Sequence, residues 1–153
     1  MDKNLTLKHL ENAMASYKKW VEDIGLLVEG NPIKSDEIAL TATESGLGSW
    51  YFDEGQKLNA IKTIPADSME LISSLHAKAH DVYLNIYKIY FDVEKKSLIK
   101  RLIRRKKKIS PEDQEVAQRH FEEIEKISRN LLEELDRLER RTAAFPESDF
   151  ELL

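Results

Sequence analysis

The feature that most constrains the fold is the stretch 68–108, which contains neither glycine nor proline. Its apolar side chains recur at alternating steps of three and four residues, the spacing of one helix face. They are Ile72, Leu75, Ala79, Val82, Ile86, Ile89 and Val93. A second stripe, His76, His80, Tyr83, Tyr87 and Tyr90, runs beside the first. Because a helix with two adjacent inward stripes needs neighbours on two sides, this pattern predicts a bundle.

The rest of the chain supplies those neighbours. Periodic apolar residues predict a first helix over 4–28, and Ser110 followed by Pro111 predicts the start of another that ends near residue 142. A short second helix is expected to begin near residue 35 and to end where Gly46 and Gly48 interrupt it. The third helix is expected to continue past residue 94 and the last to return beside it. We therefore predict an all-α, four-helix-type bundle with a long C-terminal antiparallel hairpin extension.

The predicted helices divide the chain into three parts. Residues 1–94 form the predicted bundle, and 95–143 form the basic continuation, the turn and the last amphipathic helix. Residues 144–153 form an acidic tail, which we expect to be loose or to dock on a partner. A length of 153 residues suits one domain of this kind.

Composition excludes several classes of function. The chain has no cysteine, so disulfides and thiolate nucleophiles or ligands are absent. No apolar run approaches the ~20 residues of a membrane span, and the N-terminal residues do not resemble a secretion signal. These observations predict a cytoplasmic protein.

Charge is strongly segregated along the chain. Residues 95–108 hold nine basic and no acidic side chains, between two acidic segments. We take six of these residues as candidate partner-binding residues: Arg101, Arg104, Arg105, Lys106, Lys107 and Lys108. This basic belt is either a solvated face that contacts the chain's own acidic segments, or a site for an acidic protein, an anionic membrane surface or nucleic acid. The belt has no interleaved aromatics, which counts against single-stranded nucleic acid.

His76 and His80 are the candidate metal ligands, because side chains four apart lie over one another on a helix. Zinc needs four ligands, or three and a water, and the spacing does not decide among four completing residues: Glu44, Asp53, Tyr17 and His9. Without metal, the imidazoles would bond to Tyr17, Ser45 or a water. We expect no cofactor, with zinc as the alternative, and proton sensing near neutral pH as a further one.

Three pieces of sequence, in order, carry a resemblance to a known family: Trp20 on the first helix, LGSWYFDEG from Leu47 to Gly55, and HAKAH from His76 to His80. Together they resemble the chemoreceptor zinc-binding (CZB) domain family of bacterial cytoplasmic sensor modules, over roughly residues 5–94. The resemblance implies a helical bundle in which one cysteine and three histidines bind zinc. In that family, the response of the cysteine to metal or oxidant alters the output of an attached chemoreceptor or cyclase.

Two departures from the family pattern bear on function. The expected first-helix histidine falls at Tyr17, and the expected cysteine falls at Ser45. The resemblance therefore implies a divergent member that has lost the thiolate switch. A Tyr17 hydroxyl that donates to an imidazole nitrogen would satisfy both groups without metal. We also expect the Trp50 indole to pack close to the two imidazoles inside the core.

We find no pattern that supports catalysis, and Lys78 lies at the wrong spacing from His76 for a histidine-phosphotransfer helix. The sequence thus predicts a non-enzymatic sensory, signalling or adaptor module that contacts a protein partner and forms a homodimer. One alternative is a metal-binding sensor that uses His76 and His80. Another is a binder of nucleic acid or an anionic surface through the basic belt.

Overall fold

The computed structural model describes residues 1–61, 64–91, 109–151 and 153, and within them every regular element is helical. The three long helices are α1 (Lys3–Val28), α4 (Ala66–Phe91) and α6 (Pro111–Ala144). Shorter elements are the 3₁₀ turns η1 (Ser35–Glu37) and η2 (Ala42–Glu44), α2 (Gly46–Trp50), the π-helix η3 (Tyr51–Gly55), α3 (Gln56–Leu58) and α7 (Glu147–Glu151). The all-α fold class is confirmed.

The ends of the long helices follow local sequence signals. The Asp2 side chain accepts a hydrogen bond from the Leu5 N–H at the start of α1, and Gly30 takes a positive φ of 101° just beyond its end. Ser110 caps α6 through the Asp113 N–H, and Pro111 occupies the first turn. These boundaries agree with those predicted from the sequence within about two residues, the usual uncertainty of helix ends.

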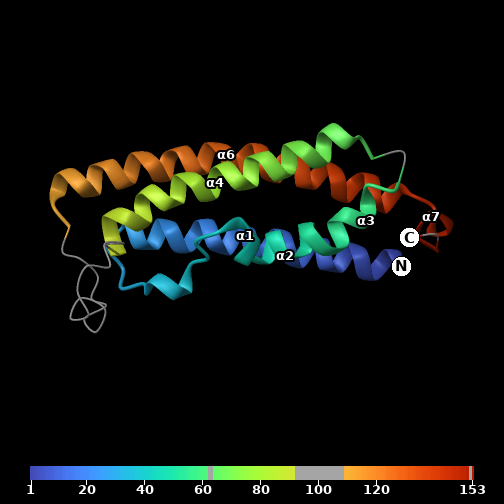
Figure 1. Ribbon diagram of the computed structural model, residues 1–153, viewed down its shortest axis with the longest axis horizontal. Coiled ribbons are helices and arrows are strands. Elements are labelled where there is room, and N and C mark those ends of the chain that lie inside the picture. Colours follow the sequence, from blue (N-terminus) through green and yellow to red (C-terminus); the bar gives the residue numbers. More distant parts are fainter. Residues whose placement is uncertain (62–63, 92–108, 152) are drawn as a thin grey trace.

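The long helices lie side by side, with α4 and α6 antiparallel and α1 packed against α6 (Figure 1). The segment from α2 through η3 to α3 lies along α1 as the fourth, shorter arm of the bundle. The inward stripes fill the core as the periodicity predicts. Fully buried examples are Leu10 and Ile24 of α1, Ile72 and Ile86 of α4, and Leu131 and Leu135 of α6.

The structure corrects the prediction for the glycine-rich segment. A second helix does not run from residue 35 to Gly46; two 3₁₀ turns occupy that stretch, and a helix begins at Gly46. The reason is that the Ser45 side chain caps the new helix through the Gly48 N–H. A Cβ on Gly48 would collide with the Ala42 carbonyl, so this glycine permits close packing and does not end a helix.

The C-terminal helix also differs from the predicted extension. Because α6 packs along α1 and α4, its apolar stripe lies in the bundle core. Two buried contacts pin it there: Tyr17 bonds to Ser128, and Ser68 donates to Glu134. The predicted continuation of the third helix past residue 94 lies outside the described residues. The other part of the predicted extension, α6, belongs to the bundle.

The acidic tail is likewise ordered against its own chain, contrary to the expectation of a loose or partner-docked segment. Phe150 of α7 is buried, and its carbonyl accepts a hydrogen bond from the Met1 ammonium at 3.0 Å. Lys3 donates to the Phe145 carbonyl at 2.7 Å. Both chain ends therefore lie at the same end of the bundle (Figure 1).

Candidate functional site

The four positions singled out from the sequence come together in the core, where α1, the start of α2 and α4 meet. The ring centroids of His76 and His80 are 4.8 Å apart and nearly perpendicular, and each residue is only 4% exposed. Ser45 and Tyr17 both reach His76, the first through its hydroxyl and the second through the edge of its ring. We refer to Tyr17, Ser45, His76 and His80 as the histidine cluster.

Ser45 fixes the protonation pattern of His76. Its hydroxyl donates to the Ala42 carbonyl at 2.7 Å and accepts from the Gly48 N–H at 2.9 Å. The His76 Nε2 atom lies 3.1 Å from the same oxygen. Since the serine's one proton is already used, His76 must be the donor, and its neutral ring therefore carries the proton on Nε2.

His80 takes the other tautomer. Its Nδ1 lies 3.0 Å from the Leu40 carbonyl, which can only accept, so the ring proton is on Nδ1. The opposite nitrogen, Nε2, is buried and has no hydrogen-bond partner among the described residues. The cluster therefore contains one buried acceptor that its own hydrogen bonds do not use.

Trp20 is the tryptophan that packs on the imidazole pair. Its indole stacks on His80 with centroids 4.2 Å apart, and its Nε1 donates to the Ala39 carbonyl at 2.9 Å. Trp20 and His80 thus bind two consecutive carbonyls, of Ala39 and Leu40, and hold the irregular 31–45 segment against the bundle. Trp50, which we expected beside the imidazoles, is buried with its ring against Gly55.

The expected bond from Tyr17 to an imidazole is not formed. The Tyr17 hydroxyl lies 2.6 Å from the Ser128 hydroxyl on α6, and only the ring of Tyr17 contacts His76, at a centroid distance of 5.9 Å. The physical reason is reach: from α1 the phenol end extends past the imidazole to the neighbouring helix. Burial raises the pKa of Tyr17 to about 12, so the phenol stays protonated at neutral pH.

Burial also keeps both histidines neutral. Desolvation, assisted by the neighbouring His80, lowers the pKa of His76 to about 4. Desolvation lowers the pKa of His80 as well, against the opposing effect of its bond to Leu40. The expectation that His76 titrates near neutral pH is therefore wrong.

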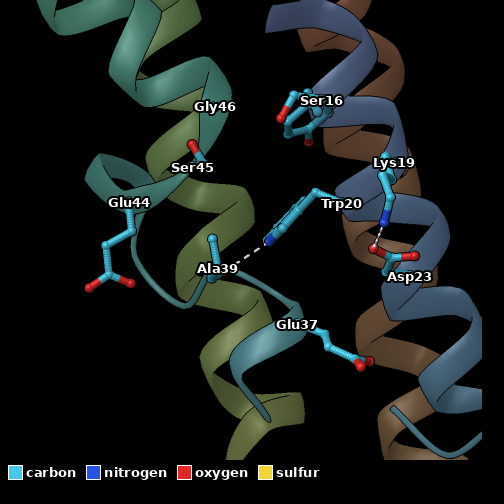
Figure 2. A pocket seen from close by; sticks show the side chains of 10 residues that line it. Ser16, Lys19, Trp20, Asp23, Glu37, Ala39, Glu44, Ser45 and Gly46 are labelled. Carbon is cyan, nitrogen blue, oxygen red and sulfur yellow. Dashed lines mark hydrogen bonds and ion pairs between the residues drawn. The ribbon is translucent and has the colours of Figure 1, made fainter. Parts of the chain in front are cut away.

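A pocket of about 160 Å³ leads from the surface to the cluster (Figure 2). Tyr17, Trp20 and Ser45 lie in its wall, between α1 and the segment that precedes α2. Its rim carries three carboxylates and one amine: Asp23, Glu37, Glu44 and Lys19. Figure 2 shows Lys19 paired with Asp23, while Glu44 points away from the Trp20 indole. The electrostatic character of the rim therefore favours small cations.

The residues proposed to complete a metal site are dispersed. Glu44 and Asp53 are exposed, and His9 bonds to Glu54 across a different part of the surface. Within residues 1–61, 64–91 and 109–151, no group of three or more histidine or acidic side chains is arranged to hold a metal ion. Of the candidates, Tyr17 has a ring contact with the imidazole pair, and Glu44 acts on His80 only through its charge, which raises the His80 pKa.

The basic belt lies outside the described residues, and so do its six candidate partner-binding residues: Arg101, Arg104, Arg105, Lys106, Lys107 and Lys108. Among the described residues, no helix is long and apolar enough to cross a membrane.

Sequence reasoning missed two parts of the site. One is Ser128, the hydrogen-bond partner of Tyr17. The sequence signal for it was a serine on the buried apolar stripe of the last helix, between Ile127 and Leu131. The other is the pair of carbonyls at Ala39 and Leu40, for which no sequence signal exists because every residue carries a carbonyl.

Comparison with protein-family models, with curated proteins and with solved structures found no match to this chain.

Proposed function

We propose that this chain is a non-enzymatic, cytoplasmic bacterial sensory or adaptor module of the CZB type that acts by contact with a signalling protein. In this proposal the histidine cluster is a metal-free descendant of a zinc site. Ser45 and Tyr17 occupy the positions of the zinc-binding cysteine and histidine of that family, and their hydroxyl groups make hydrogen bonds in place of metal bonds.

One observation carries the proposal. The four positions that the family pattern selects lie on three separate segments, yet they adjoin one another in the core. The tightest link joins the cysteine position to a histidine position, with Ser45 Oγ 3.1 Å from His76 Nε2. A chance match in sequence gives no reason for these residues to meet.

The chemistry of the cluster favours the metal-free form. Zinc prefers deprotonated or neutral nitrogen and sulfur ligands in a set of four. The Tyr17 phenol and the Ser45 hydroxyl are both protonated at neutral pH and already bond to Ser128 and Ala42. Only the two imidazoles remain as good ligands.

Restoring the two missing ligands tests the kinship. We expect the double variant Tyr17→His/Ser45→Cys to bind one equivalent of Zn²⁺ at least about 100-fold more tightly than the native chain, because a thiolate and a third imidazole complete a tetrahedral set. Competition against a chromophoric chelator measures the affinity. The Co²⁺ form of the variant would show thiolate charge-transfer absorption.

The matched control is Tyr17→His/Ser49→Cys, which introduces the same residue types with the cysteine one turn further along. Ser49 is exposed and lies in another cavity wall, so this control lacks the thiolate at the cluster and should bind zinc clearly less tightly than Tyr17→His/Ser45→Cys. Equal zinc affinity of both double variants, or no gain in either, would contradict a CZB-type site at these positions.

A second candidate function is a metal-binding sensor that retains His76 and His80. The buried Nε2 of His80 favours it, because that lone pair has no partner among the described residues and both imidazoles are neutral, as ligands must be. Elemental analysis of purified native protein separates the two candidates. One bound metal per chain, lost in His76→Ala, would favour this second function over the first.

Partner contacts remain predictions of the proposal. The sequence predicts a homodimer, although the apolar residues Leu131, Leu135 and Leu138 of the last helix are fully buried within the chain's own bundle. Light scattering of the purified protein tests the dimer. For the basic belt, nucleic-acid affinity that falls steeply with added salt would support the surface-binder alternative, and the absence of binding at low salt would remove it.

A further inference from the structure

A second cavity, of about 380 Å³, lies between α1 and the α2–η3 segment, apart from the histidine cluster. Its polar lining comes from both sides: His9 and Asn12 from α1, and Ser49, Trp50, Asp53 and Glu54 from the opposite segment. We call this cavity the His9 groove. Its size falls in the range of small-molecule sites, roughly 300–1,000 Å³.

The helices that form the groove are close at one end and bridged at the other. They approach closely where Gly46 meets Ser16, since a Cβ on this glycine would collide with the serine hydroxyl. Away from that crossing, His9 Nδ1 bonds to Glu54 Oε1 across the groove. The groove is thus bordered by a close helix crossing and by a polar bridge.

Two polar atoms of the groove residues have no partner among the described residues. One is the indole Nε1–H of Trp50, a residue only 6% exposed, and the other is Glu54 Oε2. Buried donors and acceptors are nearly always paired, because an unpaired one loses its hydration without compensation. An unpaired donor and an unpaired carboxylate oxygen on residues of the same groove indicate a missing molecule with complementary groups.

We propose that the His9 groove binds a small organic cation, a primary amine that also carries a hydroxyl or carbonyl oxygen. The ammonium donates to Glu54 and Asp53, and the oxygen accepts from the Trp50 indole. Both orphan atoms are closed to solvent and Glu54 already bonds to His9. The amine therefore reaches Glu54 by displacing the His9 imidazole, and the ligand oxygen reaches the indole N–H when the Trp50 side chain shifts toward the groove.

The charge of the lining decides the ligand class. Two carboxylates against one imidazole disfavour an anion. A metal ion is disfavoured because no three histidine or acidic side chains converge among residues the structure describes. A simple alkylamine would leave the indole N–H unpaired, and a neutral diol would leave the carboxylates unpaired.

The two tryptophans provide an internal control for the test. In ¹H–¹⁵N spectra, the Trp50 indole signal should move downfield and saturate as 2-aminoethanol or a longer amino alcohol is added. The Trp20 indole already donates to Ala39 and lies outside the groove, so its signal should not move. Trp50→Phe assigns the two signals.

Matched probes and variants complete the experiment. Ethylene glycol lacks the amine and ethylamine lacks the oxygen, so neither should produce the full shift. Glu54→Gln should weaken amino-alcohol binding by about tenfold or more, because it removes a charge-assisted bond. Asp53→Asn should weaken binding less, and Glu11→Gln, on the exposed part of α1, should leave it unchanged.

Three results would overturn the proposal. The first is a Trp50 signal that does not move and saturate at amino-alcohol concentrations that fill a millimolar site. The second is an equal movement of this signal with ethylene glycol. The third is an amino-alcohol affinity that is undiminished in both Glu54→Gln and Asp53→Asn.

Discussion

The histidine cluster and the His9 groove contain similar chemical groups in different surroundings. In each, an imidazole meets an oxygen from a neighbouring segment: His76 meets the Ser45 hydroxyl, and His9 meets the Glu54 carboxylate. The first pair is buried among aromatic rings, whereas the His9 side chain is 39% exposed. Burial therefore makes one imidazole part of the core and leaves the other able to exchange partners.

The two regions also differ in how their polar atoms are used. In the cluster, the Ser45 hydroxyl makes three hydrogen bonds. One nitrogen of each imidazole carries a proton and donates it to an oxygen, of Ser45 for His76 and of Leu40 for His80. In the groove, one indole donor and one carboxylate oxygen have no partner among the described residues, and in the cluster the His80 Nε2 acceptor has none. Hydrogen-bonded polar networks specify a single packing, whereas two unpaired groups on residues that line one groove point to a ligand. The contrast leads us to expect stability from the first region and binding from the second.

The largest expected effect is the loss of Trp20. Trp20→Ala removes the stack on His80 and the bond to Ala39, and it leaves a large void, so it should cost about 4 kcal/mol of unfolding free energy. Urea denaturation measures the change. Leu26→Ala, at a 37% exposed position on the same helix, should cost less than about 1 kcal/mol. Similar costs for both would contradict the central role of the cluster in the core.

Acid should destabilise the cluster next most strongly. Burial lowers the pKa of folded His76 to about 4 from its ordinary value of 6.5, so its contribution to stability is complete above pH 6.5 and is lost as pH falls toward 4. At about 1.4 kcal/mol per pKa unit, the full loss is about 3 kcal/mol. Urea midpoints at pH 7 and pH 4.5 measure it.

The control for the acid effect is a comparison of two variants. His76→Gln should reduce the dependence on pH between 6.5 and 4.5 and leave the part due to His80, whereas His120→Gln, on α6, should retain the full dependence. An unchanged dependence in His76→Gln would mean that other groups cause the acid sensitivity.

These two effects depend on features that the sequence predicts to different degrees. The inward placement of His76 and His80 was predictable, because helical periodicity is local and strong. The choice of Trp20 and not Trp50 as the stacking partner was not predictable. It depends on how far α1 and α4 are shifted along each other, which the periodicity of either helix leaves open.

The glycines show a second limit of sequence reasoning. In the sequence, Gly46 and Gly48 are compatible with two roles, as helix breakers or as sites of close packing. The structure distinguishes these roles, because a Cβ on either glycine would collide with a neighbouring segment. The Tyr17–Ser128 bond was missed for a similar reason, since it joins residues 111 positions apart. Partners between distant helices are set by packing and not by spacing within one helix.

A smaller effect is expected at Ser45. Ser45→Ala removes the cap on Gly48 and the acceptor of the His76 N–H, and should cost about 2 kcal/mol. Thermal unfolding measures the change. Ser49→Ala, one turn further along, removes an exposed hydroxyl and should be close to neutral. A neutral Ser45→Ala would mean that the hydroxyl does not hold the imidazole.

The smallest expected effect concerns the link to α6. Tyr17→Phe deletes the bond to Ser128 and should cost about 1 kcal/mol. The double-mutant cycle with Ser128→Ala isolates the pair, and we expect a coupling of about 0.5–1 kcal/mol. Strict additivity of the two changes would contradict a direct bond between the hydroxyls.

The most direct test of the central claim is a long-range ¹H–¹⁵N spectrum of the imidazole nitrogens at pH 7, recorded before and after one equivalent of Zn²⁺. A metal-free cluster predicts two neutral rings, His76 protonated on Nε2 and His80 on Nδ1, with signals that zinc does not change. Stoichiometric shifts of nitrogens on both rings upon addition of zinc would contradict it.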